Sequence, residues 1–160
     1  MAQRIGDRLP ADLAALFDGT SSDLHVAYPL VTVDEAGTPR FSMLSAGELL
    51  ATGDRAIRIA MWPNTRTGVN LASGREALLC VVVPGSVRYV RGNAVRLVAP
   101  PAAALECFEL AVSSVESDSH EGMPVTRPIT FDVVDPSPAE VLAAWRTQLA
   151  ALAAATPGTG

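Results

Sequence analysis

Three consecutive residues, Thr65-Arg66-Thr67, combine two hydroxyl groups with a guanidinium directly before a predicted short helix. A helix N-terminus presents free backbone N–H groups and favours negative charge. The fork of an arginine matches the geometry of a phosphate group. These residues would therefore suit an anion. The same pattern is also typical of an ordinary helix cap followed by an exposed arginine, so the residues alone leave both interpretations open.

The composition excludes several other kinds of chemistry. All twelve basic residues are arginines, so neither a lysine Schiff base nor a P-loop lysine is available. A formal net charge of −5 argues against nucleic acid as a partner. The only cysteines and histidines, Cys80, Cys107, His25 and His120, have no recognisable spacing for a metal site, and no metal is expected. No nucleophile–base pair can be identified from spacing either, so the catalytic residues stay unknown.

The first two thirds of the chain read as strands separated by turns. Residues 10–17 predict a short helix, and residues 24–33 and 39–44 predict a hairpin around the turn 34–38. Pro29 suggests that its strand is an edge strand or contains a bulge. Residues 56–62, 76–83 and 87–98 predict further strands, with a bend or bulge at Gly92. A helix starting at Thr65 or Thr67 should end near Ser73, before Gly74.

The last third predicts more helix. Residues 101–116 and 138–152 are expected to be helices, separated by a loop over 117–128 and a last strand over 129–134. The chain is expected to be one domain, residues 1–160, with a helical arm over 1–20 and a flexible tail over 153–160. The sequence shows no secretion signal and no membrane-spanning run, so a cytoplasmic protein without a membrane partner is expected. About six mostly antiparallel strands with peripheral helices favour a mainly β fold, a barrel.

From residue 24 to residue 98 the sequence resembles the pyridoxamine-phosphate-oxidase-like family of FMN-binding split barrels. The matching features are Gly37-Thr38-Pro39 inside a hairpin, a strand that ends in Met61-Trp62, and Thr65-Arg66-Thr67 leading into Asn70-Leu71. A very apolar strand and an arginine-rich strand follow. The resemblance implies a six-stranded antiparallel split barrel that forms a homodimer and holds FMN between its subunits.

The resemblance also implies a set of cofactor-binding residues. Arg58, on the strand before the motif, is the candidate for a second basic contact to the phosphate. Met61, Trp62 and the hairpin segment 41–44 would lie near the isoalloxazine ring. The cofactor-binding set is therefore Arg58, Met61, Trp62, Thr65, Arg66, Thr67 and Asn70. Relatives often have lysine where this chain has Thr67, which removes one positive charge and would weaken flavin binding.

The function that follows from the resemblance is an FMN-dependent oxidoreductase acting on an unidentified small molecule. FMN carries its own chemistry, which agrees with the missing catalytic pair. Two alternatives stay open: a non-catalytic flavin- or ligand-binding dimer serving as carrier or sensor, and the same fold using the deazaflavin F420 or haem. No dedicated residue set for pyridoxamine phosphate is present, so that activity is not expected.

Overall fold

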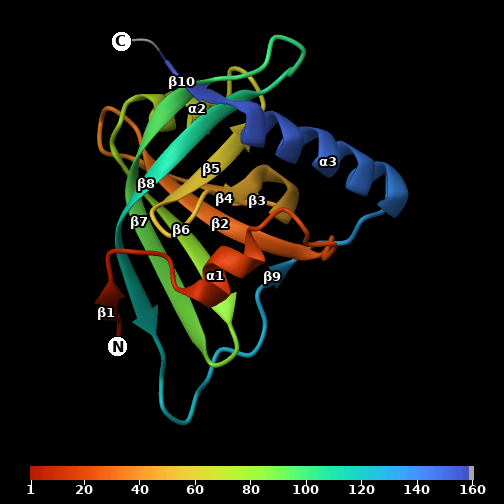
Figure 1. Ribbon diagram of the computed structural model, residues 1–160. Coiled ribbons are helices and arrows are strands. Elements are labelled where there is room, and N and C mark those ends of the chain that lie inside the picture. Colours follow the sequence, from red (N-terminus) through yellow and green to blue (C-terminus); the bar gives the residue numbers. More distant parts are fainter. Residues whose placement is uncertain (159–160) are drawn as a thin grey trace.

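The computed structural model describes residues 1–158 and shows a strongly curled antiparallel sheet with helices on its outside (Figure 1). The main path of the sheet follows the order β3-β2-β6-β7-β8-β5-β4. Its strands are β2 (Val26–Val33), β3 (Pro39–Leu44), β4 (Leu49–Ala51), β5 (Ala56–Met61), β6 (Glu76–Val83), β7 (Ser86–Val98) and β8 (Glu106–Asp118). Three short strands join this path: β1 (Gln3–Gly6), β9 (Ile129–Thr130) and β10 (Thr156–Pro157). The helical elements are α1 (Ala11–Leu16), α2 (Arg66–Ala72), α3 (Pro138–Ala154) and the 3-10 turn η1 (Ala46–Glu48).

The barrel is open along one seam. Strands β3 and β4 end the sheet path and, within the described residues, do not pair with each other. The turn η1 connects them along the chain, and α3 packs against η1, β4 and β5 at this seam. The expected fold class, a mainly β split barrel with peripheral helices, is therefore confirmed, with more strands than the six that were predicted.

Alternating side chains of the strands fill the barrel. Ile57 and Ile59 of β5 are fully buried, as are Phe108 and Leu110 of the neighbouring β8. Helix α1 adds Leu13 to the same core, which continues into Phe17 just after the helix. Since one face of each strand serves this core, the opposite face is available for helices and ligands.

The prediction of a helix over residues 101–116 is wrong. This stretch forms most of β8, which pairs with β7 on one side and β5 on the other. The apolar residues of this stretch were interpreted as one face of a helix, whereas the period-two spacing of Phe108 and Leu110 is that of a strand with one buried face. The predicted irregularity at Gly92 is confirmed, because the β7–β8 register shifts between Arg91 and Gly92. A Cβ at Gly92 would overlap the backbone carbonyl of Ala111.

Strand β2 is an inner strand, which corrects the edge-or-bulge prediction drawn from Pro29. It pairs with β3 on one side, and on the other side first with β9 and then with β6. The register leaves Tyr28 and Pro29 between these last two partners. A residue that cannot donate a hydrogen bond is accommodated there. The strand expected over 129–134 is shorter than predicted and comprises only β9.

Both ends of the described chain are paired with the barrel. The arm over 1–20 contains α1 as expected, but its first residues form β1, which pairs with β8. In the segment expected to be a flexible tail, Ala153 and Ala154 continue α3, and β10 pairs with Leu97 and Val98 of β7. The final two residues of that segment, 159–160, lie outside the described residues. No helix within residues 1–158 combines the length and the apolar character needed to cross a membrane.

Candidate functional site

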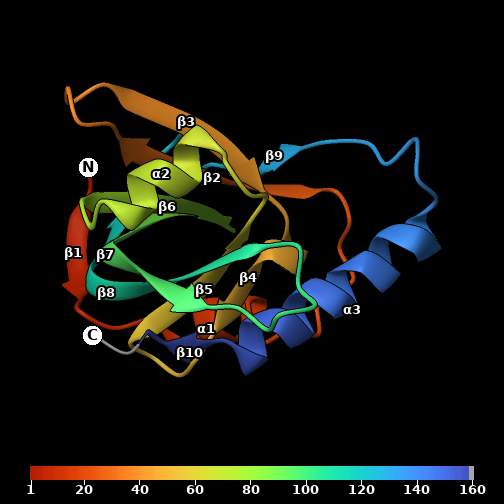
Figure 2. The ribbon, with the colours of Figure 1, turned by 90° about the horizontal axis from the view of Figure 1, so that it is seen from above.

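A cavity of about 870 Å³ lies between the β2–β3 hairpin and α2. Seen from above, α2 lies beside β3 at the hairpin side of the barrel (Figure 2). The hairpin and the first residues of β3 form one wall, and α2 with the turn after it forms the other. The lining residues are Asp34, Glu35, Ala36, Thr38, Pro39, Arg40, Phe41, Arg66, Val69, Asn70, Ser73 and Arg75.

Three arginines line this cavity from three different segments. Arg40 comes from β3, Arg66 from the first turn of α2, and Arg75 from the turn that follows α2. Within residues 1–158, none of the three forms an ion pair with a carboxylate. The arrangement therefore concentrates guanidinium groups that remain able to bind an anion.

One face of α2 supplies its share of the lining. Arg66, Val69, Asn70 and Ser73 follow the three- and four-residue spacing that places side chains on the same side of a helix. The helix begins at Arg66 because Thr65 caps it: the Thr65 Oγ1 accepts a hydrogen bond from the Gly68 N–H at 3.1 Å. It ends as predicted, before Gly74 with its positive φ of 72°.

Thr67 and Asn70 fix α2 against the hairpin. The Thr67 side chain is 2% exposed, and its Oγ1 lies 2.6 Å from the Ser42 Oγ and accepts a hydrogen bond from the Arg40 Nε at 3.3 Å. Asn70 donates from Nδ2 to the Thr32 Oγ1 at 3.1 Å. Thr67 thus positions Arg40 rather than presenting its hydroxyl to open solvent.

The N-terminus of α2 faces a carboxylate of the chain itself. A Cβ at Gly68 would lie 2.7 Å from the Glu106 Oε2, and the other oxygen of Glu106 accepts a hydrogen bond from Arg96 at 2.6 Å. The cationic character of the site therefore lies along the flank of α2, toward the hairpin. The sequence had suggested the helix N-terminus instead.

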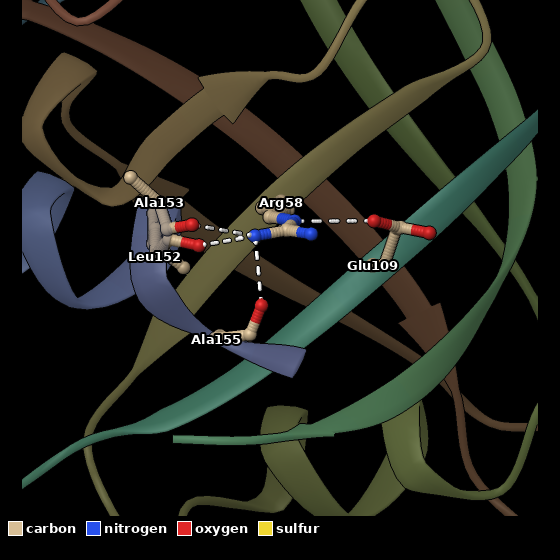
Figure 3. A network of polar contacts seen from close by, with 5 residues as sticks. All are labelled: Arg58, Glu109, Leu152, Ala153 and Ala155. Atoms are coloured by element: carbon tan, nitrogen blue, oxygen red, sulfur yellow. Dashed lines mark hydrogen bonds and ion pairs between the residues drawn. The ribbon is translucent and has the colours of Figure 1, made fainter. Parts of the chain in front are cut away.

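Arg58 is engaged outside the cavity. Its Nη1 donates to the carbonyl oxygens of Leu152, Ala153 and Ala155 at 2.6, 3.2 and 3.0 Å, and its Nε pairs with Glu109 at 3.1 Å (Figure 3). Its side chain is 15% exposed. The structure therefore does not bring Arg58 together with Arg66, and the guanidinium holds the C-terminal end of α3 to β5.

Met61 and Trp62 also lie outside the cavity lining. Met61 points into the barrel core and is 7% exposed, whereas Trp62 is 59% exposed at the end of β5. In the hairpin segment, Phe41 lines the cavity and Leu44 is buried in the core. Of the seven residues expected to bind a cofactor, Arg66 and Asn70 line this cavity and Thr67 lies directly behind it.

The sequence analysis missed Arg40 and Arg75 as site residues. A signal for Arg40 was present, because it directly follows Gly37-Thr38-Pro39 at the start of the second hairpin strand. Arg75 gave no local signal. It reaches the site because Gly74 turns the chain back from α2 into β6.

An antiparallel barrel opened between β3 and β4, with a short helix packed on the first hairpin, defines a split barrel of the pyridoxamine-phosphate-oxidase-like type. Among the solved structures that are similar to this chain, two illustrate the shared fold. A "putative pyridoxamine 5'-phosphate oxidase" from Lactobacillus delbrueckii has a TM-score of 0.55 and 15% identity, covering 71% of this chain and 98% of that one. HupZ from Group A Streptococcus has a TM-score of 0.55 and 11% identity, covering 73% of this chain and 98% of that one.

The chain belongs to the family of YclD from Bacillus subtilis (strain 168), an uncharacterized protein. The two sequences are 33% identical over 143 residues, which cover 86% of this chain and 90% of YclD. No protein-family model matches the chain.

Proposed function

We propose that the cavity between the hairpin and α2 binds FMN, and that the protein is an FMN-dependent oxidoreductase acting on a small molecule. The observation that carries the proposal is the convergence of Arg40, Arg66 and Arg75 on one cavity. A phosphate monoester carries up to two negative charges, and guanidinium groups are its best side-chain partners.

The other lining groups suit the remainder of a flavin. Phe41 and Val69 are 57% and 63% exposed and give the cavity apolar surface for an aromatic ring. The two acidic lining residues do not pair with the arginines. Asp34 accepts hydrogen bonds from the N–H groups of Ala36 and Thr38 within its own turn, and neither Asp34 nor Glu35 forms an ion pair within residues 1–158. Three arginines against two acids leave the lining with a formal excess of one positive charge. The volume also lies within the usual range of cofactor sites, about 300–1,000 Å³.

The lining contains no histidine, cysteine, lysine or tyrosine. The work of this chain would be to hold the phosphate, orient the ring and limit its contact with water. FMN supplies hydride transfer when it is bound. The split-barrel structure described as a "putative pyridoxamine 5'-phosphate oxidase" supports the proposal of redox chemistry, and the substrate of the present chain is proposed only as a small organic molecule.

The same lining supports a second candidate, a non-catalytic flavin-binding protein that serves as carrier or sensor. A site without a conventional proton donor is compatible with storage as well as catalysis. The two functions separate in one assay: an oxidoreductase bleaches its flavin absorbance when NADH or NADPH is added anaerobically, and a carrier does not. Adding a deazaflavin or haem to the FMN-loaded protein tests the remaining alternative, because a ligand that competes for the site would displace FMN.

The binding test is a fluorescence titration of FMN with the wild type and Arg66→Ala. Loss of one charge-assisted contact should weaken FMN binding by at least about tenfold. Arg40→Ala and Arg75→Ala should have effects in the same direction. Arg146→Ala, which removes an exposed arginine of α3 outside the cavity, is the matched control and should leave the affinity unchanged.

Unchanged affinity in all three cavity variants would mean that the phosphate is bound elsewhere. In that case Arg58→Ala and Thr65→Ala test the remaining sequence-based contacts. The proposed roles of Met61 and Trp62 near the ring stay predictions and belong to the same titration series.

A further inference from the structure

A second cavity, of about 330 Å³, is lined by the end of β3, by η1 and by the segment between β9 and α3. Figure 1 shows the course of that segment from β9 to α3. The second cavity shares no lining residue with the first cavity. Its inner wall comes from Met43 of β3 and from η1, and its outer wall is the segment 131–136. Val141 and Trp145 of α3 complete it.

The walls of this cavity are held in place from several sides. Phe131 and His25 form two hydrogen bonds, from the Phe131 N–H to the His25 carbonyl at 3.0 Å and between the His25 Nδ1 and the Phe131 carbonyl at 3.1 Å. The other end of the segment enters α3 through the capping box of Ser137 and Glu140. The indole of Trp145 lies directly against the backbone of Gly47, where any Cβ would overlap it.

The carboxylate of Glu48 lies on the inner wall of this cavity. The Oε2 of Glu48 accepts hydrogen bonds from the N–H and the Oγ of Ser45 at 2.6 and 2.8 Å. Within the described residues, no donor is bonded to the Oε1 of Glu48. Burial raises the pKa of Glu48, because the charged carboxylate is less well solvated there than in water.

Every charged residue that lines the second cavity is acidic. Besides Glu48 these are Asp132 and Asp135 of the outer segment, and no arginine reaches the lining. The remaining wall is mostly apolar, with Trp145 6% exposed and Phe131 36% exposed. Aromatic walls around one carboxylate provide ion pairing and cation–π attraction to the same guest.

We propose that the second cavity binds a small organic cation, an ammonium group on an apolar body, with Glu48 as its counter-ion and Trp145 and Phe131 as its walls. The first cavity, with three arginines, has the opposite charge preference. This proposal does not depend on flavin binding, because the two cavities use different residues.

The test compares three probes of similar size and different charge: 2-phenylethylammonium, 2-phenylethanol and 3-phenylpropionate. Trp62→Phe leaves Trp145 as the sole tryptophan, so its emission reports on the cavity directly. The full chain is titrated without added flavin. The ammonium probe should bind at least about tenfold more tightly than the alcohol, and the carboxylate should bind most weakly. Equal binding of the three probes, preference for the carboxylate, or no binding of the ammonium would overturn the proposal.

Glu48→Gln tests the counter-ion. Glutamine can still cap Ser45, so the substitution removes the charge and keeps the turn. We expect binding of the ammonium probe to weaken by at least about tenfold and binding of the alcohol to change little. Glu140→Gln is the matched control, since it alters the same position of the other capping box outside the cavity.

A second variant tests the site without touching Glu48. Val134 lines the cavity and is 89% exposed, so Val134→Arg adds a cation at the rim with little effect on folding. This substitution should weaken binding of the ammonium probe and leave binding of the alcohol unchanged. Equal loss for both probes, or an equal effect of Glu140→Gln and Glu48→Gln, would contradict the assignment of Glu48 as counter-ion.

Discussion

Two glutamates in this chain occupy the same position of a capping box and have opposite surroundings. Glu48 and Glu140 each accept hydrogen bonds from the N–H and the Oγ of the serine three residues earlier, Ser45 and Ser137. Glu48 lines the second cavity, and burial raises its pKa. Glu140 is exposed, and the hydrogen bonds of Ser137 lower its pKa. The capping motif is the same at both glutamates, and their surroundings decide whether the pKa is raised or lowered.

These directions predict opposite pH effects on stability. The raised pKa of Glu48 gives a contribution that is complete below its ordinary value of 4.5 and is lost as pH rises through the folded-state pKa. The wild type should therefore lose stability relative to Glu48→Gln as pH rises. The lowered pKa of Glu140 predicts that the wild type gains relative to Glu140→Gln as pH rises. Urea unfolding from about pH 3 to about pH 8 measures both differences, and slopes of equal sign would contradict the assignment.

At the scale of elements, helix α3 is attached to the barrel at the open seam between β3 and β4. The Trp145 indole packs on Gly47 of η1, and Arg58 of β5 binds carbonyl groups at the C-terminal end of the helix. Carbonyls at a helix end have no partner inside the helix, so the partly buried guanidinium of Arg58 satisfies groups that would otherwise be costly. Ala60, Leu152 and Ala155 form an apolar cluster around this contact.

Arg58→Met should reduce the free energy of unfolding by about 2–4 kcal/mol, because it leaves those carbonyls and Glu109 without their partner. Arg58→Lys should recover only part of the loss, since an ammonium lacks the planar fork. Equilibrium urea unfolding provides the measurement, and Arg146→Ala should stay within about 0.5 kcal/mol of the wild type. A neutral Arg58→Met would show that water satisfies the helix end equally well.

The elements that the sequence predicted well are those with local signals. The hairpin turn at 34–38, the Thr65 cap and the stop before Gly74 all depend on residues a few positions apart. Strand β8 was missed because its conformation depends on two neighbours that pair with it at once. Contacts between distant segments also explain why only part of the candidate site was predicted. Arg66 belonged to a local motif, whereas Arg40 and Arg75 reach the cavity through the packing of α2 on the hairpin.

At the scale of the whole molecule, large apolar side chains remain uncovered around the first cavity and beyond it. Phe41, Trp62 and Val69 are each more than half exposed, and within residues 1–158 β3 pairs with β2 alone, which leaves its outer edge free. Such surface is typical of an interface between subunits. It supports the proposal, which the family resemblance also implies, that the protein is a homodimer.

Sedimentation equilibrium should therefore give twice the chain mass of 16.7 kDa. Trp62→Ser should raise the dimer dissociation constant by at least about tenfold, because an exposed tryptophan is a frequent anchor of interfaces. Val134→Ser, which changes an even more exposed apolar position outside this surface, serves as the control. A monomeric wild type at high concentration would refute the dimer and would require each chain to hold its ligand alone.

The contacts of Arg58 also impose an order of events on a chain leaving the ribosome. Its acceptors on α3 and beyond it lie 94 to 97 residues later in the sequence, whereas Glu109 lies 51 residues later. A nascent chain can thus pair β5 with β8 while the seam beside them still has no helix. The open seam would expose the apolar surface of β4 and β5 to chaperones until residue 155 has emerged.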